Sequence, residues 1–363
     1  ITRCLVGSEM CIRDSKITTQ LRRLGSSLDW SSERFTLDDD YQNAVISAFI
    51  QLFDEGLIYQ GKRLVNWDPV LETSLSDLEV INKDQVIKIW EIKYQLEDSE
   101  EFVTVATTRP ETLLGDMALA VNPNDQRFIH LIGKNASIPL CNRMIPIVAD
   151  DYVDPEFGTG VVKITPGHDF NDYELGKRHG LHMDKNSLCH VGDEDVFAPI
   201  SILNKKVEIV GIAPKKFHGM DRFDARKLLL EDLQKEKLLV SEDKYESTLP
   251  YGDRSDQILE PLLTDQWYVD AKTLAKPAIE AVKSKEIQFV PNNWEKTYFQ
   301  WMDNILDWCI SRQLWWGHRI PIWYDESNQP YAGFSEKDVR EKNNLQGSLR
   351  QEEDVLDCLL YTS

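Results

Sequence analysis

Hydrophobic residues follow two kinds of spacing along this chain. Over residues 36–59 they recur every three or four positions from Tyr41 to Phe53, which places them on one face of a predicted helix. Gly56 then interrupts the pattern, and the run KRLVNW at residues 62–67 predicts a strand. A helix followed by a strand is typical of an α/β domain.

From about residue 86 the pattern changes to short strands separated by Gly and Pro, which predicts a β-rich, barrel-like module. The predicted strands span residues 86–96, 101–108, 143–150, 158–165 and 200–211. Helical periodicity then covers residues 221–239, 271–282 and 296–310, and a strand is predicted at 320–324. Trp301 and Trp308 lie seven residues apart and are expected on the buried face of the last helix. Because the α/β pattern stops and resumes, we expect one domain inserted into another.

Composition fits a folded protein outside the membrane. The chain has 363 residues, 42% of them hydrophobic, and no apolar run approaches the roughly 20 residues that span a bilayer. The formal net charge of −20 argues against nonspecific nucleic-acid binding through bulk charge. The six cysteines form no CxxC pair, so neither a zinc site nor a disulfide framework is predicted, and reduced thiols point to the cytoplasm.

Polar groups concentrate where the predicted strand 158–165 gives way to a helix. Strand alternation puts Lys163 and Thr165 on one face. Asp169 and Asp172 follow at the helix start, three residues apart. Two carboxylates beside a lysine and a threonine can bind an α-amino group while the cation meets a phosphate or an ester oxygen. The structural alternative is an N-cap at Asp169, with Asp172 supporting the first turn.

A second polar segment, VATTRPETLLGD at residues 105–116, lies about fifty residues earlier. Thr108 and Glu111 match the S/T-x-x-E capping box, with Pro110 at the first helical position. Three polar side chains remain available for a ligand: Thr107, Arg109 and Thr112. Both segments combine free N–H groups with the positive end of a helix, so we expect one pocket built from two sides.

His168 is the candidate general acid or base by residue type, or else it orders Asp169 through a hydrogen bond. The sequence has no serine or cysteine in an elbow motif that would serve as its nucleophile. Attack by a water molecule, held by positioned polar groups, therefore fits these residues better than covalent catalysis.

Taken together, these segments resemble the valyl-tRNA synthetases of class I. The resemblance extends from about Lys16 to Asp357 and is carried by QLRRLGSSLDWSSERFTLD, EGLIYQGKRLVNWDPVLETSLSDLEV, ATTRPETLLGD, KITPGHDFNDYE, EPLLTDQWYV and WCISRQLWWGHRIPIWY. The leucyl type is similar at TTRP but typically has Asp where Glu111 stands. The isoleucyl type lacks the TTRPET form, so both sister types are disfavoured.

The resemblance implies a Rossmann-type catalytic domain, split by a β-rich, barrel-like editing domain that hydrolyses threonine wrongly attached to tRNA(Val). Residues 16–85 and 250–357 would form the catalytic domain, and residues 86–249 the insertion. The implied editing pocket comprises Thr107, Arg109, Thr112, Lys163, Thr165, Asp169 and Asp172. Arg109 and Lys163 would face the terminal adenosine of the tRNA, and Trp316 would line the valine pocket. Valyl-tRNA synthetase is itself the standard case of this selectivity problem, since an apolar pocket rejects the hydroxyl of threonine by only about 10²-fold.

The resemblance also implies a monomeric cytoplasmic enzyme that uses ATP with Mg²⁺, acts on valine and tRNA(Val), and has no membrane attachment. The sequence lacks both ATP signatures of the family, HIGH and KMSKS. We therefore expect an internal fragment that binds no cofactor and cannot aminoacylate. Residues 1–15 and 358–363 resemble translated sequencing adapters and are expected to be foreign.

Two departures from the family pattern affect these expectations. Where some relatives have a cysteine zinc site, this chain reads YGDRSDQILEP, so no zinc or other metal is expected. Gly167 stands where alanine is usual, which is expected to loosen the turn.

Two other functions stay open on sequence alone. A tRNA-binding module without catalysis would bind tRNA regardless of the amino acid it carries. An isoleucyl-type or leucyl-type synthetase would discharge valine or norvaline instead of threonine.

Overall fold

The computed structural model describes residues 16–362 apart from 98, 142, 184–188 and 192–198, so the expectation for residues 1–15 lies outside the described residues. Its α-helices include α2 Asp39–Asp54, α3 Phe170–Arg178, α4 Arg222–Lys235, α5 Ala271–Lys283, α6 Trp294–Met302, α7 Glu336–Asn343 and α8 Cys358–Thr362. Short 3₁₀ helices are η1 Trp30–Ser32, η2 Asp77–Glu79, η3 Pro110–Gly115, η4 Ile129–Leu131 and η5 Lys215–Phe217. Helices and mixed sheets together give an α/β fold, as predicted.

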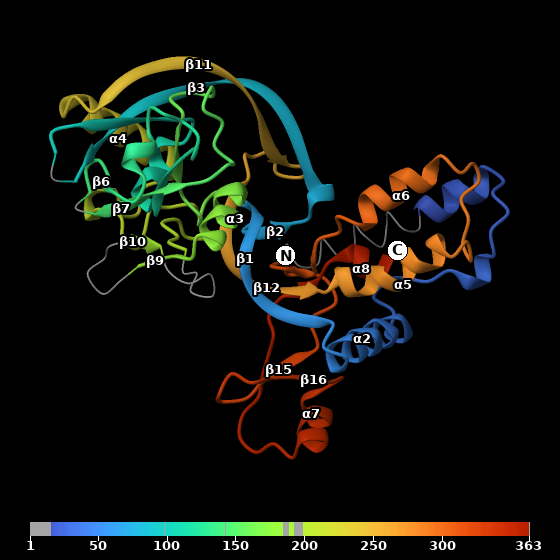
Figure 1. Cartoon of the computed structure of the whole chain (residues 1–363). Coiled ribbons are helices and arrows are strands. Elements are labelled where there is room, and N and C mark those ends of the chain that lie inside the picture. Colours follow the sequence, from blue (N-terminus) through green and yellow to red (C-terminus); the bar gives the residue numbers. More distant parts are fainter. Residues whose placement is uncertain (1–15, 98, 142, 184–188, 192–198, 363) are drawn as a thin grey trace.

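A seven-stranded sheet organises the β-rich module, which we define as residues 80–252 (Figure 1). Its strands are β3 Val80–Leu96, β4 Phe102–Thr107, β5 Ala118–Val121, β6 Asn135–Ser137, β7 Met144–Ala149, β8 Val161–Ile164 and β11 Leu239–Gly252. They run in the order β11-β3-β6-β7-β5-β8, and β4 pairs with β3. Strands β5 and β7 are parallel, whereas β5 and β8 are antiparallel. A separate two-stranded sheet pairs β9 Leu181–Met183 with β10 Cys189–Val191.

The module has its own hydrophobic core. Leu113 and Met117, on either side of the end of η3, are fully buried in it. Helix α4 contributes Leu229 and Leu233, four residues apart and therefore on one helix face. This packing, which includes Ile164, fixes η3 and the end of β8, the two places where the sequence concentrates polar groups.

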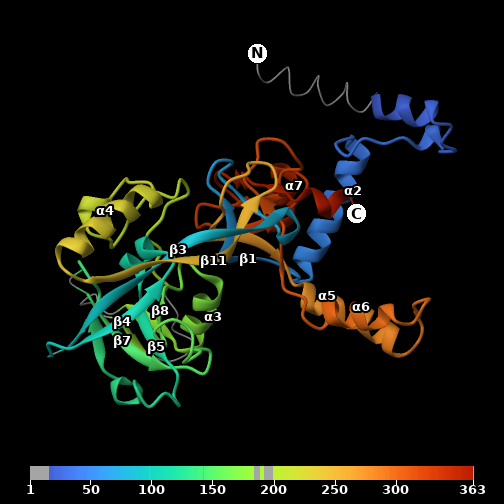
Figure 2. The same ribbon diagram turned by 90° about the horizontal axis from the view of Figure 1, so that it is seen from above.

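Two long antiparallel pairs, β1 with β12 and β3 with β11, connect the module to the rest of the molecule. Strand β1 (Ile58–Asp68) pairs with β12 (Glu260–Val269), in register from Ile58 opposite Val269 to Trp67 opposite Glu260. The chain enters the module from β1 through β2 (Thr73–Leu75) into β3, and leaves it from β11 into β12. Figure 2 shows β1 and two strands of the module, β3 and β11, between the rest of the module and the helices α2, α5 and α6.

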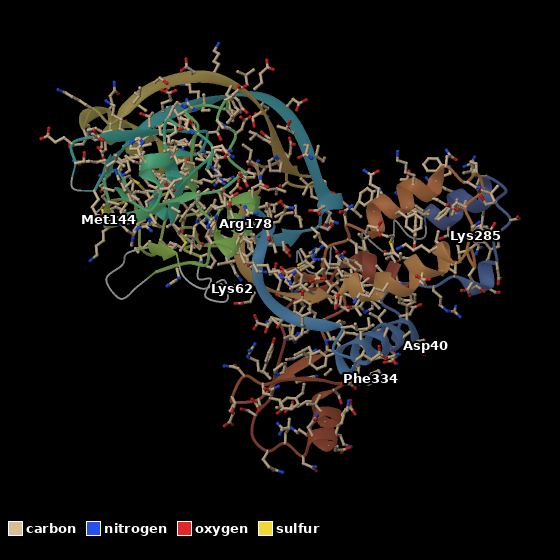
Figure 3. All side chains as sticks on the ribbon, viewed as in Figure 1. Asp40, Lys62, Met144, Arg178, Lys285 and Phe334 are labelled. Atoms are coloured by element: carbon tan, nitrogen blue, oxygen red, sulfur yellow. The ribbon has the colours of Figure 1, made fainter. Side chains whose placement is uncertain are left out.

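The remaining elements surround a second core. Phe49 of α2, Trp267 of β12 and the buried Ile310 pack together there. The short strands of this part are β13 Trp308–Cys309, β14 Ser311–Arg312, β15 Ile322–Tyr324, β16 Pro330–Ala332, β17 Arg350–Gln351 and β18 Val355–Leu356. In Figure 3, Met144 marks the module, and Phe334 marks the β15–β16 region at the far side of the molecule.

Most predicted elements are present, with three differences. Residues 200–211 form only isolated bridges, Leu203 with Ile209 and Glu208 with Asp221, instead of a strand. Helix α6 ends at Met302 rather than near residue 310, because Asp303 and the asparagine after it favour turns over helix interiors. Trp301 is 73% exposed, so the expected buried tryptophan face is wrong. Within the described residues, the structure holds no helix both long and apolar enough to cross a membrane.

Candidate functional site

Lys163 on β8 is the centre of the first group of polar contacts. Its side chain is only 8% exposed. Its Nζ donates to Thr112 Oγ1 at 2.8 Å and to Asp116 Oδ1 at 3.1 Å, and it also contacts Thr165 Oγ1. These three acceptors match the three protons of an ammonium group. The two predicted polar segments therefore meet at this amine, and a substrate oxygen would have to replace one of the hydroxyl groups.

Asp116 is a central member of this group that the sequence interpretation missed. It follows η3 directly and is fully buried. Its Oδ1 accepts from Thr165 Oγ1 at 2.6 Å as well as from Lys163, and its Oδ2 accepts from the Tyr94 hydroxyl at 2.7 Å. A buried carboxylate needs such partners. Its position at the end of the motif ATTRPETLLGD is the sequence feature that could have identified Asp116 as a site residue.

Asp172 approaches the same group from α3. It is 8% exposed, and its Oδ2 accepts a hydrogen bond from the backbone N–H of Thr165 at 2.8 Å. Burial, followed by the nearby carboxylate of Asp169, raises the pKa of Asp172 to about 7. Both protonation states of Asp172 are therefore populated near neutral pH.

Asp169 takes the capping role that was the structural alternative. It is the N-cap of α3, and its Oδ1 accepts from the backbone N–H groups of Asn171 at 2.8 Å and Asp172 at 3.1 Å. Asp169 is half-buried, unlike the buried Asp172. The two aspartates thus differ in function: one holds the helix start, and the other contacts the strand end.

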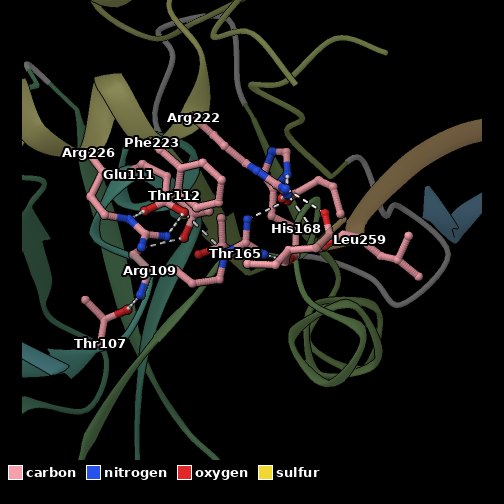
Figure 4. Close-up of polar contacts among 12 residues, drawn as sticks. Thr107, Arg109, Glu111, Thr112, Thr165, His168, Arg222, Phe223, Arg226 and Leu259 are labelled. Atoms are coloured by element: carbon pink, nitrogen blue, oxygen red, sulfur yellow. Dashed lines mark hydrogen bonds and ion pairs between the residues drawn. The ribbon is translucent and has the colours of Figure 1, made fainter. Parts of the chain in front are cut away.

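Arg109 is the centre of a second group of contacts (Figure 4). Its Nη1 donates to the carbonyl oxygen of His168 at 2.9 Å, and its Nη2 donates to Glu260 Oε1 at 2.5 Å. Its Nε lies 3.4 Å from Glu111 Oε1. All three guanidinium nitrogens are thus engaged within the protein, so Arg109 joins the two polar segments directly.

The expected capping box at Thr108 and Glu111 is wrong. The N-cap of η3 is Arg109, without a side-chain cap, although Pro110 does occupy the first helical position. Arg226 of α4 binds the buried carboxylate of Glu111 through two hydrogen bonds of 2.7 and 2.8 Å. A bidentate guanidinium is a stronger partner than a backbone N–H, and no local sequence pattern reveals a partner more than a hundred residues away.

His168 is buried, and its Nε2 accepts a hydrogen bond from the backbone N–H of Ile202 at 2.9 Å. The ring proton therefore belongs on Nδ1, which lies 3.6 Å from Glu260 Oε1. Burial lowers the pKa of His168, so the neutral form is favoured. The imidazole of His168 thus binds the backbone of Ile202. This hydrogen bond replaces the one to Asp169 that was the alternative role for His168.

Thr107 and Trp316 complete the predicted set. Thr107 ends β4, and its Oγ1 accepts from the backbone N–H of Arg109 at 3.1 Å. Trp316 is 45% exposed and packs against Trp315 with ring centroids 5.9 Å apart. It follows β14, outside the β-rich module, so it does not belong to the contact groups of Lys163 and Arg109.

Gly167 has a tightly packed backbone instead of the expected loose turn. A Cβ atom at this position would lie 2.0 Å from the carbonyl oxygen of Ile200. Glycine is therefore required unless the segment around residue 200 moves.

No group of three or more His, Cys, Asp or Glu residues suited to a metal ion occurs in the part of the chain that the structure describes. The absence of zinc from the protein stays a prediction. An apolar cavity does occur elsewhere, between α2, α5 and α6, with Leu52, Leu274 and Met302 among its lining residues.

Comparison with known proteins agrees with the motifs. Residues 9–361 match the family model of the class I tRNA synthetases (I, L, M and V). The valine--tRNA ligase of Legionella pneumophila (strain Paris) is 57% identical over 343 residues, which cover 94% of this chain and 36% of that protein. The valine--tRNA ligase of Coxiella burnetii (strain RSA 493 / Nine Mile phase I) is 52% identical, with 96% and 36% covered.

The valine--tRNA ligase of Acinetobacter baylyi (strain ATCC 33305 / BD413 / ADP1) is 53% identical over 357 residues, with 94% of this chain and 36% of that protein covered. The chain thus spans about 36% of the length of the relatives it matches. A solved ternary complex of Agrobacterium radiobacter K84 agnB2 LeuRS with tRNA and LeuAMS aligns at a TM-score of 0.32 and 16% identity, too low to support a conclusion. By the family match, which covers nearly the whole sequence, this chain belongs to the class I tRNA synthetases of the isoleucine, leucine, methionine and valine group.

Proposed function

We propose that this chain is part of a valine--tRNA ligase and that its β-rich module removes threonine from mischarged tRNA(Val). The module would be an editing domain inserted into a Rossmann-type catalytic domain. The full-length enzyme would activate valine with ATP and Mg²⁺ and transfer it to tRNA(Val), with Trp316 lining the valine pocket. Relatives with 52–57% identity, all valine--tRNA ligases, support this proposal.

The contact group of Lys163 is the observation that carries the editing proposal. It gathers two threonine hydroxyls and a buried carboxylate within hydrogen-bond distance of one ammonium group. Each of these groups can exchange a protein partner for a hydroxyl, ester or ammonium group of a substrate. A pocket that recognises threonine needs such groups, because threonine differs from valine by a single hydroxyl in place of a methyl.

The reaction is the hydrolysis of an ester. A water oxygen attacks the carbonyl carbon of the threonyl ester, and the bond from that carbon to the ribose oxygen breaks. Asp172 accepts the proton of the water and returns it to the ribose oxygen, a task suited to a carboxylate with a pKa of about 7. Lys163 stabilises the negative charge that develops on the carbonyl oxygen. Asp169, half-buried at the start of α3, faces the ammonium group of the substrate.

The test measures threonine release from threonyl-tRNA(Val) by the 363-residue chain. Asp172→Asn keeps the shape and removes the base, so the rate should fall on the order of 100-fold. Asp243→Asn, which changes an exposed residue of β11 in the same module, is the matched control and should keep the wild-type rate. Full activity of Asp172→Asn would remove Asp172 from the mechanism.

The same assay separates the alternatives. A module that only binds tRNA would bind threonyl-tRNA(Val) and uncharged tRNA(Val) equally well without releasing threonine. An isoleucyl-type or leucyl-type editing site would release valine or norvaline in preference to threonine.

A further inference from the structure

Glu260 is a buried carboxylate that contacts the β-rich module from outside it. It is the first residue of β12, after the chain has left the module, and it is 1% exposed. A fully buried carboxylate is costly unless charged partners surround it, so its surroundings indicate what it stabilises.

Two guanidinium groups of the module, those of Arg109 and Arg222 (both labelled in Figure 4), bind Glu260. Arg109 Nη2 lies 2.5 Å from Oε1, and Arg222 Nη1 lies 2.5 Å from Oε2. Burial alone would raise the pKa of Glu260, but Arg109, His168 and Arg222 outweigh it and hold this pKa well below the usual range. Glu260 is therefore ionised at neutral pH.

A short path of contacts leads from Glu260 to the candidate site. Arg109, bound to Glu260, donates to the carbonyl oxygen of His168. The N–H of His168 in turn donates to the carbonyl oxygen of Thr165 at 3.0 Å. Thr165 contacts Lys163 through its hydroxyl and Asp172 through its N–H. Every link is a hydrogen bond between groups that are buried or half-buried.

We propose that Glu260 is a positioning residue for the hydrolytic site: it fixes Arg109, which fixes the turn at residues 165–168 and thereby Thr165 and Asp172. This proposal rests on the proposed editing function for its effect on rate. Because Glu260 lies on β12, outside the module, the module by itself lacks a residue that positions its site. Arg222 reinforces the arrangement, because its Nη2 donates to the carbonyl oxygen of Ile258 at 2.6 Å and holds the start of β12 against α4.

Glu260→Gln tests the proposal, because it keeps the shape and removes the charge that Arg109 and Arg222 share. Asp307→Asn is the matched control. It breaks the ion pair with Arg63 of β1, 3.1 Å long, and Asp307 takes part in none of the contacts that link Glu260 to Asp172. We expect Glu260→Gln to lower kcat for threonyl-tRNA(Val) hydrolysis on the order of 100-fold with little change in KM, since a misplaced group weakens the transition state more than binding. Asp307→Asn should leave both constants unchanged.

Hydrogen exchange gives a second readout that does not depend on activity. Glu260→Gln should speed backbone exchange in residues 163–172, whereas Asp307→Asn should not. If Arg109 transmits the effect, Arg109→Gln combined with Glu260→Gln should lose no more activity than Arg109→Gln alone.

Unchanged exchange over residues 163–172 in folded Glu260→Gln would overturn the positioning role. A wild-type kcat in Glu260→Gln, with Asp172→Asn inactive, would also overturn it while leaving the editing function intact. Faster exchange in Glu260→Gln, together with a wild-type chain that releases no threonine, would support the positioning role and refute the proposed function instead.

Discussion

At the scale of single residues, the site is defined by a buried ammonium that is already saturated with protein acceptors. Lys163 contacts two hydroxyls and one carboxylate, and only the carboxylate of Asp116 carries a charge that can balance it within that group. Asp116 therefore determines whether Lys163 can remain buried in its charged form.

Asp116→Asn should lower the free energy of unfolding by about 3–5 kcal/mol, because it leaves the Lys163 ammonium buried without its counter-charge. Urea unfolding of the variant and the wild type measures this difference. Asp232→Asn, which removes the half-buried partner of the exposed Lys216 and Lys235, is the control and should change stability by less than about 1 kcal/mol. Equal losses in the two variants would contradict the role given to Asp116.

The raised pKa of Asp172 predicts two pH effects. If its carboxylate is the base, the hydrolysis rate should rise with pH up to about 7 and then level off, and Asp172→Asn should abolish this slope. Folded Asp172 also retains a proton that the unfolded chain loses near its ordinary pKa of 3.8, so the free energy of unfolding should fall as pH rises from there towards 7. Melting temperatures of wild type and Asp172→Asn between pH 4 and 8 test this sign. A constant difference between the two would contradict the shift.

At the scale of elements, the turn between β8 and α3 holds the site together. Gly167 lies in this turn, against the backbone of residue 200. Gly167→Ala should destabilise the chain by about 1–3 kcal/mol, since the new Cβ meets the carbonyl oxygen of Ile200. Gly61→Ala on β1 is the control, because its Cβ would make an ordinary contact of 3.4 Å with Tyr59. A thermal shift assay compares them, and a fully stable Gly167→Ala would show that the segment at residue 200 moves freely.

The sequence predicted elements best where periodicity was long. The apolar positions of α2 and α4 were sufficient, because a helical pattern depends on neighbours within the same element. Residues 200–211 alternate like a strand, yet they pair only at two isolated bridges, since the formation of a strand depends on a partner outside the segment.

The same limit applies to the site. The seven residues predicted for the module lie in two short motifs, and the structure links those motifs through contacts of Arg109 with His168 and of Lys163 with Thr112. Glu260 and Arg226 were missed, because each reaches the motifs from more than ninety residues away.

At the scale of the whole molecule, β1 and β12 belong to two hydrophobic cores at once. Val65, Trp67 and Leu262 pack in the core of the β-rich module. Ile58 and Trp267, further from the module on the same strands, pack in the second core. This shared pair explains how the module is held in a fixed place relative to Glu260.

Trp67→Ala should therefore cost about 3–5 kcal/mol of stability, because Trp67 is fully buried and its Nε1 donates to the carbonyl oxygen of Lys205 at 2.7 Å. Trp301→Ala should change stability by at most about 0.5 kcal/mol, since Trp301 is exposed. Chemical unfolding followed by circular dichroism measures both variants. A similar loss in the two would contradict the position of Trp67 between the module and the β1/β12 pair.

We propose that the module hydrolyses threonyl esters of tRNA(Val) by recognising the threonine hydroxyl. The most direct measurement is the single-turnover hydrolysis rate of threonyl-tRNA(Val) and of valyl-tRNA(Val) by the same 363-residue chain. We expect much faster release of threonine than of valine, and a loss of that difference in Asp172→Asn. Equal rates for the two esters, or no release of threonine at all, would contradict it.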